Sequence, residues 1–253
     1  MKETKNMVDY LKKYLETVKG EKLSEEEIQD KVKQSSDKLG KMFEKLEPKN
    51  RKTIKEFYSK NREYLFDLAG ANEWDLFKNR IRFTKELMLD NNLNSIVDFG
   101  GGCGWSSLEF AKSGFDVTYV DYEGELMEFA KWLFKEEGVN VRVISLDAFF
   151  EEEEKYDVVY SNEVLEHIYD FGKALIKMTE ASNKAIVVFY CYTNEGNLNQ
   201  HINLSPDAIF YMYRMFQIHG FNSNHKLPDN IFVKKPYFGY KPYLCKDKSR
   251  VSN

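Results

Sequence analysis

The chain has 253 residues, enough for one large α/β domain with an added helical segment. Hydrophobic residues make up 42% and charged residues 31%, a balance that predicts a packed core and excludes disordered, collagen-like and low-complexity classes. A formal net charge of -4 gives no electrostatic basis for nucleic-acid binding, so we expect no nucleic-acid partner. Because no apolar run reaches membrane-span length and no signal-peptide run follows the first residues, we expect a cytoplasmic protein without membrane contact.

Apolar residues recur at helical spacing up to about residue 92 and predict a helical N-terminal segment. The expected helices cover residues 7–18, Ser24 to about Pro48, 54–68 and 74–89. We interpret residues 1–92 as a lid or substrate-binding segment. Its aromatic residues Tyr58, Tyr64 and Trp74 are candidates for contact with a ligand, although aromatic residues at helical spacing are more typical of a core.

After Asn94, short apolar runs alternate with helical stretches, which indicates βα units and a parallel sheet. The expected strands cover 95–99, 116–121, 140–146, 156–161 and 185–190, and the helices between and after them cover 105–113, 124–137, 171–182 and 205–219. A terminal hairpin containing Ile231, Phe232 and Val233 completes the pattern. The sequence therefore predicts an α/β fold for residues 93–253, a doubly wound, Rossmann-like, seven-stranded, mostly parallel sheet with an N-terminal helical extension.

The strongest local motif is the glycine-rich stretch from Asp98 to Gly104, DFGGGCG, which follows the first strand and leads into a helix. Such a turn lies at the carboxyl edge of a doubly wound sheet, where ligands bind, and glycines let a ligand approach the backbone. A nicotinamide or flavin site needs G-x-G-x-x-G, but the last position falls on Trp105 or Ser107 in the two possible registers. Dinucleotide binding is therefore disfavoured, though not eliminated.

The glycine turn resembles the D/E-x-G-x-G-x-G motif of class I S-adenosylmethionine-dependent methyltransferases. Asp121 then ends the second strand, Asp147 ends the third, and residues 156–167, YDVVYSNEVLEH, are similar to the family's fourth-strand motif. The resemblance covers about residues 94–235. It implies S-adenosylmethionine as cofactor, with Asp121 accepting the ribose hydroxyls and Asp147 facing the adenine amino group. The cofactor-binding residues it implies are Asp98, Gly100, Gly101, Gly102, Gly104, Asp121, Tyr122, Asp147, Ala148, Asn162 and Glu163.

A divalent metal is possible at Glu163, Glu166 and His167, which form an E-x-x-E-H motif. Their i, i+3 and i, i+4 spacings would place them on one helical face. A similar motif occurs in ubiquinone-pathway O-methyltransferases and small-RNA 2'-O-methyltransferases, where it can bind a metal. A site without metal is favoured here; magnesium or manganese would suit the carboxylates, and zinc or iron would suit His167.

The resemblance implies an enzyme that transfers a methyl group from S-adenosylmethionine to an oxygen or nitrogen of a small-molecule substrate. His201 and His167 are the candidate catalytic bases, because an imidazole titrates near neutral pH. The alternatives are an RNA or protein methyltransferase and a non-catalytic methyltransferase-like binding module. Nothing in the sequence specifies an oligomeric state. The widely spaced Cys103, Cys191 and Cys245 form no C-x-x-C pair, so we expect free thiols and no metalloid methylation.

Overall fold

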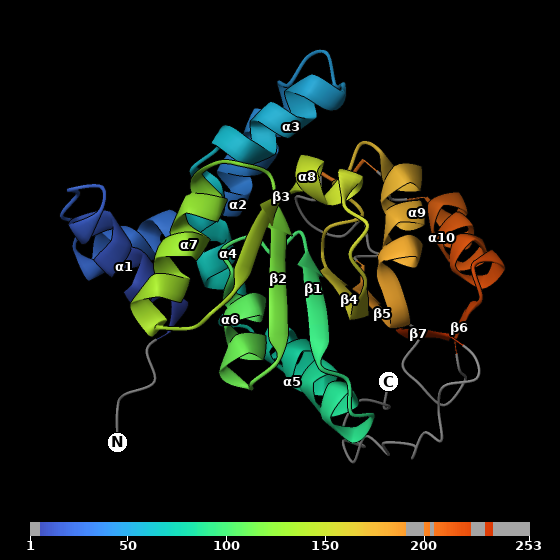
Figure 1. The fold of residues 1–253 in the computed structure, drawn as a ribbon. Helices are drawn as coiled ribbons and strands as arrows, with labels where there is room; N and C mark the ends of the chain where they lie inside the picture. The colour runs from blue at the N-terminus through green and yellow to red at the C-terminus, as the bar shows by residue number, and fades with distance from the viewer. Residues whose placement is uncertain (1–5, 191–199, 203–204, 224–230, 235–253) are drawn as a thin grey trace, which may run out of the picture.

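The computed structural model describes residues 6–190, 200–202, 205–223 and 231–234 and contains a helical N-terminal segment followed by an α/β unit (Figure 1). The N-terminal helices are α1 (Met7–Thr17), α2 (Glu25–Glu44), α3 (Arg51–Lys60), α4 (Glu63–Ala71) and α5 (Asp75–Asp90). The single helix expected over 54–68 is wrong, because Asn61 leaves helical geometry at ψ 104° between α3 and α4. Of the three cysteines, Cys103 is a buried free thiol, while Cys191 and Cys245 lie outside the described residues.

A seven-stranded sheet with the order β3-β2-β1-β4-β5-β7-β6 forms the centre of the α/β unit. Its strands are β1 (Ser95–Phe99), β2 (Asp116–Asp121), β3 (Arg142–Ser145), β4 (Tyr156–Asn162), β5 (Ser182–Phe189), β6 (Phe221–Ser223) and β7 (Ile231–Lys234). The first five strands pair in parallel, while β7 runs antiparallel to both β5 and β6. The predicted doubly wound, mostly parallel sheet is confirmed, and its strand order reverses between β1 and β4.

Five further helices, α6 (Trp105–Lys112), α7 (Glu125–Glu137), α8 (Leu146–Glu151), α9 (Phe171–Ala181) and α10 (Pro206–Ile218), flank the sheet (Figure 1). Neighbouring strand residues face opposite layers, as the pleat requires. Ile96 packs in the cluster that includes α5 and α6, whereas Val97 packs in the cluster that includes α9 and α10. Both faces are therefore covered, which explains the apolar strands without alternation.

Helix α8 is absent from the sequence-based assignment, which continued the third strand to residue 146. Strand β3 ends at Ser145, whose side chain accepts a hydrogen bond from the backbone N–H of Ala148 at 3.2 Å. This cap starts α8, and Asp147 therefore lies in the first turn of that helix. Among the described helices, none is long and apolar enough to cross a membrane.

The N-terminal helices share a core with the α/β unit. Tyr14 of α1 is only 1% exposed, and its ring meets that of Phe129 in α7 edge-on, with centroids 5.0 Å apart. The ring of Trp132, which is also in α7, has its centroid 5.3 Å from that of Tyr14. Because one hydrophobic cluster joins residues of α1–α4 to residues of α7, folding of the two parts is coupled.

We expect Tyr14→Ala to lower the free energy of unfolding by about 3 to 5 kcal/mol, the range for removing a large buried aromatic side chain. Denaturant unfolding followed by circular dichroism measures this change. Tyr211→Ala is the matched control, because Tyr211 also lies on a helix but is 46% exposed. Equal effects of the two substitutions would contradict a shared core beneath α1.

Candidate functional site

A cavity of about 1060 Å³ lies between the carboxyl edge of the sheet and the N-terminal helices. It is lined by these residues singled out from the sequence: Asp98, Gly100, Gly101, Gly102, Asp121, Tyr122, Asn162, Glu163, His167 and His201. Gly104, Asp147, Ala148 and Glu166 do not line it. The structure therefore brings the ends of β1, β2 and β4 together with His201, which follows β5 in the chain.

The glycine turn after β1 has left-handed backbone angles and is closely packed against neighbouring side chains. Gly100 and Gly102 have φ values of +77° and +55°, in the left-handed region that side chains disfavour. A Cβ on Gly100 would lie 2.5 Å from the side chain of Val164, and one on Gly102 would lie 2.9 Å from Leu68. The turn therefore presents backbone, with no side chain, beneath α4 and beside the loop that follows β4.

Asp121, at the end of β2, is held against this turn by two backbone hydrogen bonds. One carboxylate oxygen accepts from the N–H of Gly102 at 2.7 Å and the other accepts from the N–H of Tyr122 at 2.6 Å. Burial raises the pKa of Asp121 to about 6, while these N–H groups act in the opposite direction. At pH 7 the carboxylate is therefore ionised and offers its remaining lone pairs as acceptors at the cavity wall.

Asp98, at the buried start of the turn, accepts a hydrogen bond from the Ser107 hydroxyl at 2.7 Å. Burial raises the pKa of Asp98 to about 7, and the Ser107 hydrogen bond opposes that change. With only 2% of its surface exposed, this carboxyl ties the turn to the start of α6. Gly104 lies at that helix start and packs against Ala130 and Phe134 of α7, away from the cavity.

Asp147 and Ala148 are exposed in the first turn of α8. Asp147 forms an ion pair with Lys55 of α3, and nearby Arg51 pairs with Asp170 at 2.7 Å. A separate cavity of about 20 Å³ lies between these groups and Tyr122, which lines both cavities. The end of β3 and the start of α8, where the resemblance implies an adenine site, are thus in contact with α3. The role of Asp147 in binding adenine stays a prediction.

The loop after β4 does not form the helical face expected for the E-x-x-E-H motif. Residues 163–170 form turns, and Glu163 has a φ of +55°, so its side chain diverges from those of Glu166 and His167. Its carboxylate pairs with Arg80 of α5 at 2.6 Å. The helical interpretation of this motif is therefore wrong, because a single left-handed residue breaks the i, i+3 relation.

Arg80 is a cavity residue that the sequence analysis missed. Besides pairing with Glu163, its guanidinium donates to the side-chain oxygen of Asn162 at 2.8 Å. The guanidinium also lies over the rings of Phe77 and Phe189, at 5.3 and 5.0 Å from their centroids. The sequence showed only that Arg80 lies on a predicted amphipathic helix. Surface arginines without a functional role commonly occupy such positions.

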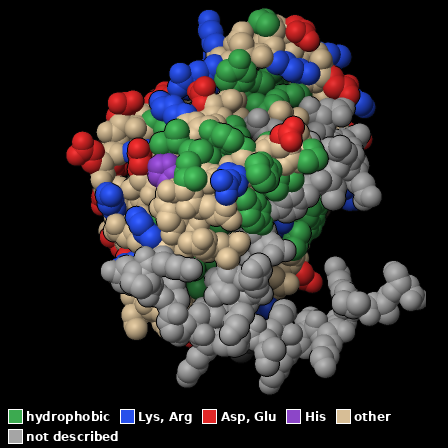
Figure 2. Space-filling model, turned by 90° about the vertical axis from the view of Figure 1, so that its right-hand side faces the viewer, with side chains coloured by type: hydrophobic (Ala, Val, Ile, Leu, Met, Phe, Trp, Pro, Cys, Tyr) green, Lys and Arg blue, Asp and Glu red, His purple; other side chains and the backbone are tan. Residues whose placement is uncertain are grey.

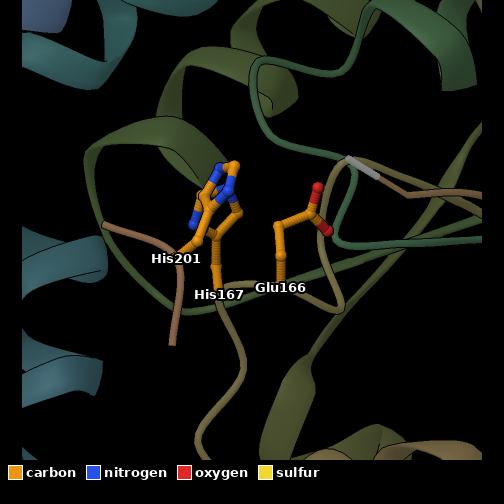
Figure 3. Close-up of side chains that lie close together, drawn as sticks. All are labelled: Glu166, His167 and His201. Carbon is orange, nitrogen blue, oxygen red and sulfur yellow. The ribbon is translucent and has the colours of Figure 1, made fainter. Parts of the chain in front are cut away.

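Glu166, His167 and His201 come together beside the cavity and extend their side chains in the same direction (Figure 3). One ligand atom from each lies within 4.8 Å of the others, and Glu166 is fully buried. The backbone N–H of Ile202 donates to the carbonyl of Glu166 at 2.7 Å, which ties the segment carrying His201 to this loop. His201 thus takes the place expected for Glu163. One carboxylate with two imidazoles suits zinc or iron better than magnesium.

Both histidines are neutral at pH 7. Burial lowers the pKa of His167 to about 3, with the neighbouring His201 acting in the same direction, and burial lowers the pKa of His201 to about 4. Their rings meet edge-on with centroids 4.6 Å apart. The expectation that these imidazoles titrate near neutral pH is therefore wrong. Both offer a free lone pair at pH 7, but the burial that keeps them neutral also disfavours their protonated form and makes them weak bases.

Three further residues complete this end of the cavity. Tyr58 of α3 and Tyr64 of α4 both line it, and their rings lie 5.2 Å apart. The hydroxyl of Tyr64 donates to the side-chain oxygen of Gln200, which the sequence analysis did not single out. Helical spacing had favoured a core role for the tyrosines, and their hydroxyl contacts depend on a segment more than 130 positions away in the chain.

Comparison with known proteins gives a family match across most of the chain. A family model described as "Methyltransferase domain" matches residues 42–222. The chain is 32% identical over 120 residues to a ubiquinone biosynthesis O-methyltransferase of Hydrogenovibrio crunogenus, covering 46% of this chain and 49% of that protein. It is 35% identical over 82 residues to a release factor glutamine methyltransferase of Streptococcus pneumoniae, covering 30% of this chain and 29% of that protein. The chain thus spans about half or less of the length of these relatives.

Among solved structures, the fold is similar to magnesium protoporphyrin IX methyltransferase from Synechocystis, crystallised with bound S-adenosylhomocysteine. The TM-score is 0.51 at 13% sequence identity, and the match covers 88% of this chain and 98% of that one. At this identity the similarity supports the fold, including the helices before the sheet.

We expect Gly102→Val to abolish binding of S-adenosylmethionine, the cofactor that the glycine-turn resemblance implies, while the sheet stays folded. A valine there would occupy space at the cavity wall and would carry left-handed strain of at least about 1 to 2 kcal/mol. Calorimetry measures binding and circular dichroism measures folding. Gly114→Val is the matched control, because Gly114 has a φ of +88° with open space around it. Undiminished binding by Gly102→Val would show that the turn is only a connection.

Proposed function

This chain belongs to the methyltransferase domain family, in its class I S-adenosylmethionine-dependent branch, and we propose that it methylates a hydroxyl group of a small-molecule acceptor. One observation carries the proposal: a single cavity is lined both by the glycine turn with Asp121 and by two neutral histidines. Its volume of about 1060 Å³ lies at the upper limit of small-molecule sites, consistent with a cofactor and an acceptor bound together.

The residues around the turn fit S-adenosylmethionine. Asp121 accepts the ribose hydroxyls, and the left-handed glycines allow close approach of the ligand. Arg80, whose guanidinium donates to Asn162 and Glu163, binds the carboxylate of the cofactor's methionine portion. Glu163 binds the ammonium group of the same portion. When bound, the cofactor supplies an electrophilic methyl group on a sulfonium.

The protein's contribution to the reaction is alignment and removal of one proton. The acceptor oxygen forms a bond to the methyl carbon as the bond from that carbon to sulfur breaks, and the hydroxyl proton passes to the imidazole of His167. His167 is neutral at pH 7, and its ring is held by Tyr58, whereas His201 stands beside it as the second candidate. The helices α3 and α4 exclude water from this end of the cavity.

A metal-assisted reaction is the competing mechanism at the same site. Glu166, His167 and His201 would hold the ion, which would acidify the acceptor hydroxyl as a Lewis acid. Proton transfer without metal is the simpler proposal, because it needs no group beyond the two imidazoles, which are neutral at pH 7. Their lowered pKa values make them weak bases, so the mechanism requires an acidic acceptor hydroxyl.

Acceptor screening tests the proposal directly. We expect release of S-adenosylhomocysteine with one or more members of a panel of hydroxylated small molecules, and less release with their amine analogues. Release that requires a protein or RNA acceptor would instead favour the alternative in which the chain acts on a macromolecule.

With the acceptor so identified, we expect His167→Ala to lower kcat by about 10² to 10⁴ at pH 7 with little change in cofactor affinity, the usual contribution of a general base. His201→Ala is measured alongside, and His219→Ala is the matched control, because His219 is exposed at the end of α10. Wild-type turnover in both cavity variants would remove the imidazoles from the mechanism.

Turnover by the intact protein should persist after dialysis against EDTA, because no step of the proposed mechanism uses a metal. Loss of activity that zinc or iron(II) restores, but magnesium does not, would replace proton transfer to His167 by metal assistance at Glu166, His167 and His201.

We expect Asp121→Asn to weaken S-adenosylmethionine binding by about 1.5 to 3 kcal/mol, the range for hydrogen bonds to a charged group. Since the pKa of Asp121 is about 6, the carboxylate is available above that pH and is lost as the pH falls through it. Affinity measured by calorimetry should therefore be full at pH 7 to 8 and fall below pH 6. The asparagine variant should lose the part of this fall that Asp121 causes, whereas Asp98, whose pKa is raised to about 7, titrates in both proteins. A wild-type profile identical to that of Asp121→Asn would rule out the ribose role.

A further inference from the structure

Tyr58 connects the N-terminal helices to the proposed catalytic imidazole. Its hydroxyl oxygen lies 2.9 Å from Nδ1 of His167 and donates to the backbone carbonyl of Gln200 at 3.2 Å. The same carbonyl lies 3.4 Å from Nδ1 of His167. Three polar atoms from α3, the loop after β4 and residue 200 therefore form one hydrogen-bonded group.

The protons available to this group determine how it is arranged. The Gln200 carbonyl can only accept, and the Tyr58 hydroxyl has one proton to donate. If that proton goes to Gln200, the contact between Tyr58 and His167 is a hydrogen bond only when Nδ1 carries the ring proton and donates to the tyrosine oxygen. If the proton goes to His167 instead, the carbonyl loses its tyrosine donor. The first arrangement makes both hydrogen bonds, and the second makes one.

We infer that Tyr58 is a positioning residue that keeps the proton of neutral His167 on Nδ1 and leaves Nε2 with a free lone pair. A histidine whose Nδ1 is committed to a structural partner presents Nε2 as its basic atom. The use of Nε2 in methyl transfer rests on the proposed function, whereas the position of the proton does not. By this assignment, the helical segment before the sheet takes part in preparing the base.

Tyr58 and the Gln200 carbonyl are held in place by their surroundings. The ring of Tyr58 lies edge-on to Phe57, 5.4 Å away, and tilted against Tyr64, 5.2 Å away. The side chain of Gln200, which is 8% exposed, accepts from the hydroxyl of Tyr64. The two tyrosines therefore divide the contacts with Gln200: Tyr64 anchors its side chain, and Tyr58 links its carbonyl to the imidazole.

Nitrogen-15 NMR of the full-length protein labelled at histidine reads the proton position directly. The chain has four histidines, and comparison with His167→Gln identifies the signals of His167. In EDTA-treated protein at pH 7.5 we expect a pyrrole-type shift for Nδ1 and a pyridine-type shift for Nε2. The reversed pattern would overturn the inference. Because no acceptor is needed, this result is independent of whether methyl transfer is observed.

Tyr58→Phe tests the role of the hydroxyl with the ring retained. We expect the ratio of the Nδ1–H form to the Nε2–H form to fall by about two- to tenfold, the equivalent of one hydrogen bond. Tyr10→Phe is the matched control, since it removes the hydroxyl of a buried tyrosine that donates to Glu137, away from the imidazole. An unchanged ratio in Tyr58→Phe, in protein shown to be folded by circular dichroism, would assign the effect to the Gln200 carbonyl alone and overturn the role of Tyr58.

Discussion

The left-handed glycines of the turn leave little room for side chains at Gly100, and the geometry of the site depends on this constraint. A Cβ on Gly100 would collide with Val164, so the loop carrying His167 can approach β1 only if that position is glycine. A Cβ on Gly102 would meet only the end of the Leu68 side chain in α4, so there the left-handed φ of +55° is the stronger reason for glycine. The absence of two side chains thus brings the loop after β4 and the N-terminal helices to one cavity.

Removal of the site from water sets the charge state of its groups. Burial raises the pKa of Asp121 and lowers the pKa of both His167 and His201, because it disfavours the charged form in each case. At pH 7 the lining of the cavity consequently contains an anion at the turn and two neutral imidazoles. The guanidinium of Arg80, which also lines the cavity, donates to Asn162 and Glu163. The arrangement suits a zwitterionic, cationic cofactor beside an acceptor that must lose a proton.

The N-terminal helices are part of this site and also part of the core. Tyr14 buries its ring against α7, while Tyr58 and Tyr64 reach the segment at residue 200. Because these helices share a hydrophobic cluster with α7, side-chain packing fixes their position beside the cavity. The ion pairs of Arg51 with Asp170 and of Lys55 with Asp147 lie at the separate small cavity and connect α3 to the loop before α9 and to α8.

The sequence by itself determined the features that depend on short stretches of chain. The apolar runs and helix signals after Asn94 predicted the parallel sheet, and the glycine turn with Asp121 indicated the ligand-binding edge. These features follow from backbone preferences and periodicity over about ten residues, which neighbouring positions specify together. The strand ends also share one edge by topology, so grouping Asp98, Asp121 and Asn162 required no side-chain detail.

Only the tertiary structure decided which side chains meet. One left-handed residue at Glu163 separated it from Glu166 and His167, and His201 entered from a distant segment instead. Arg80, Tyr58 and Gln200 joined the site through contacts between residues 82 to 142 positions apart. Asp147 met Lys55 because a short helix followed β3. Such pairings depend on loop dihedrals and on the packing of whole elements, and no local pattern of residues carries that information.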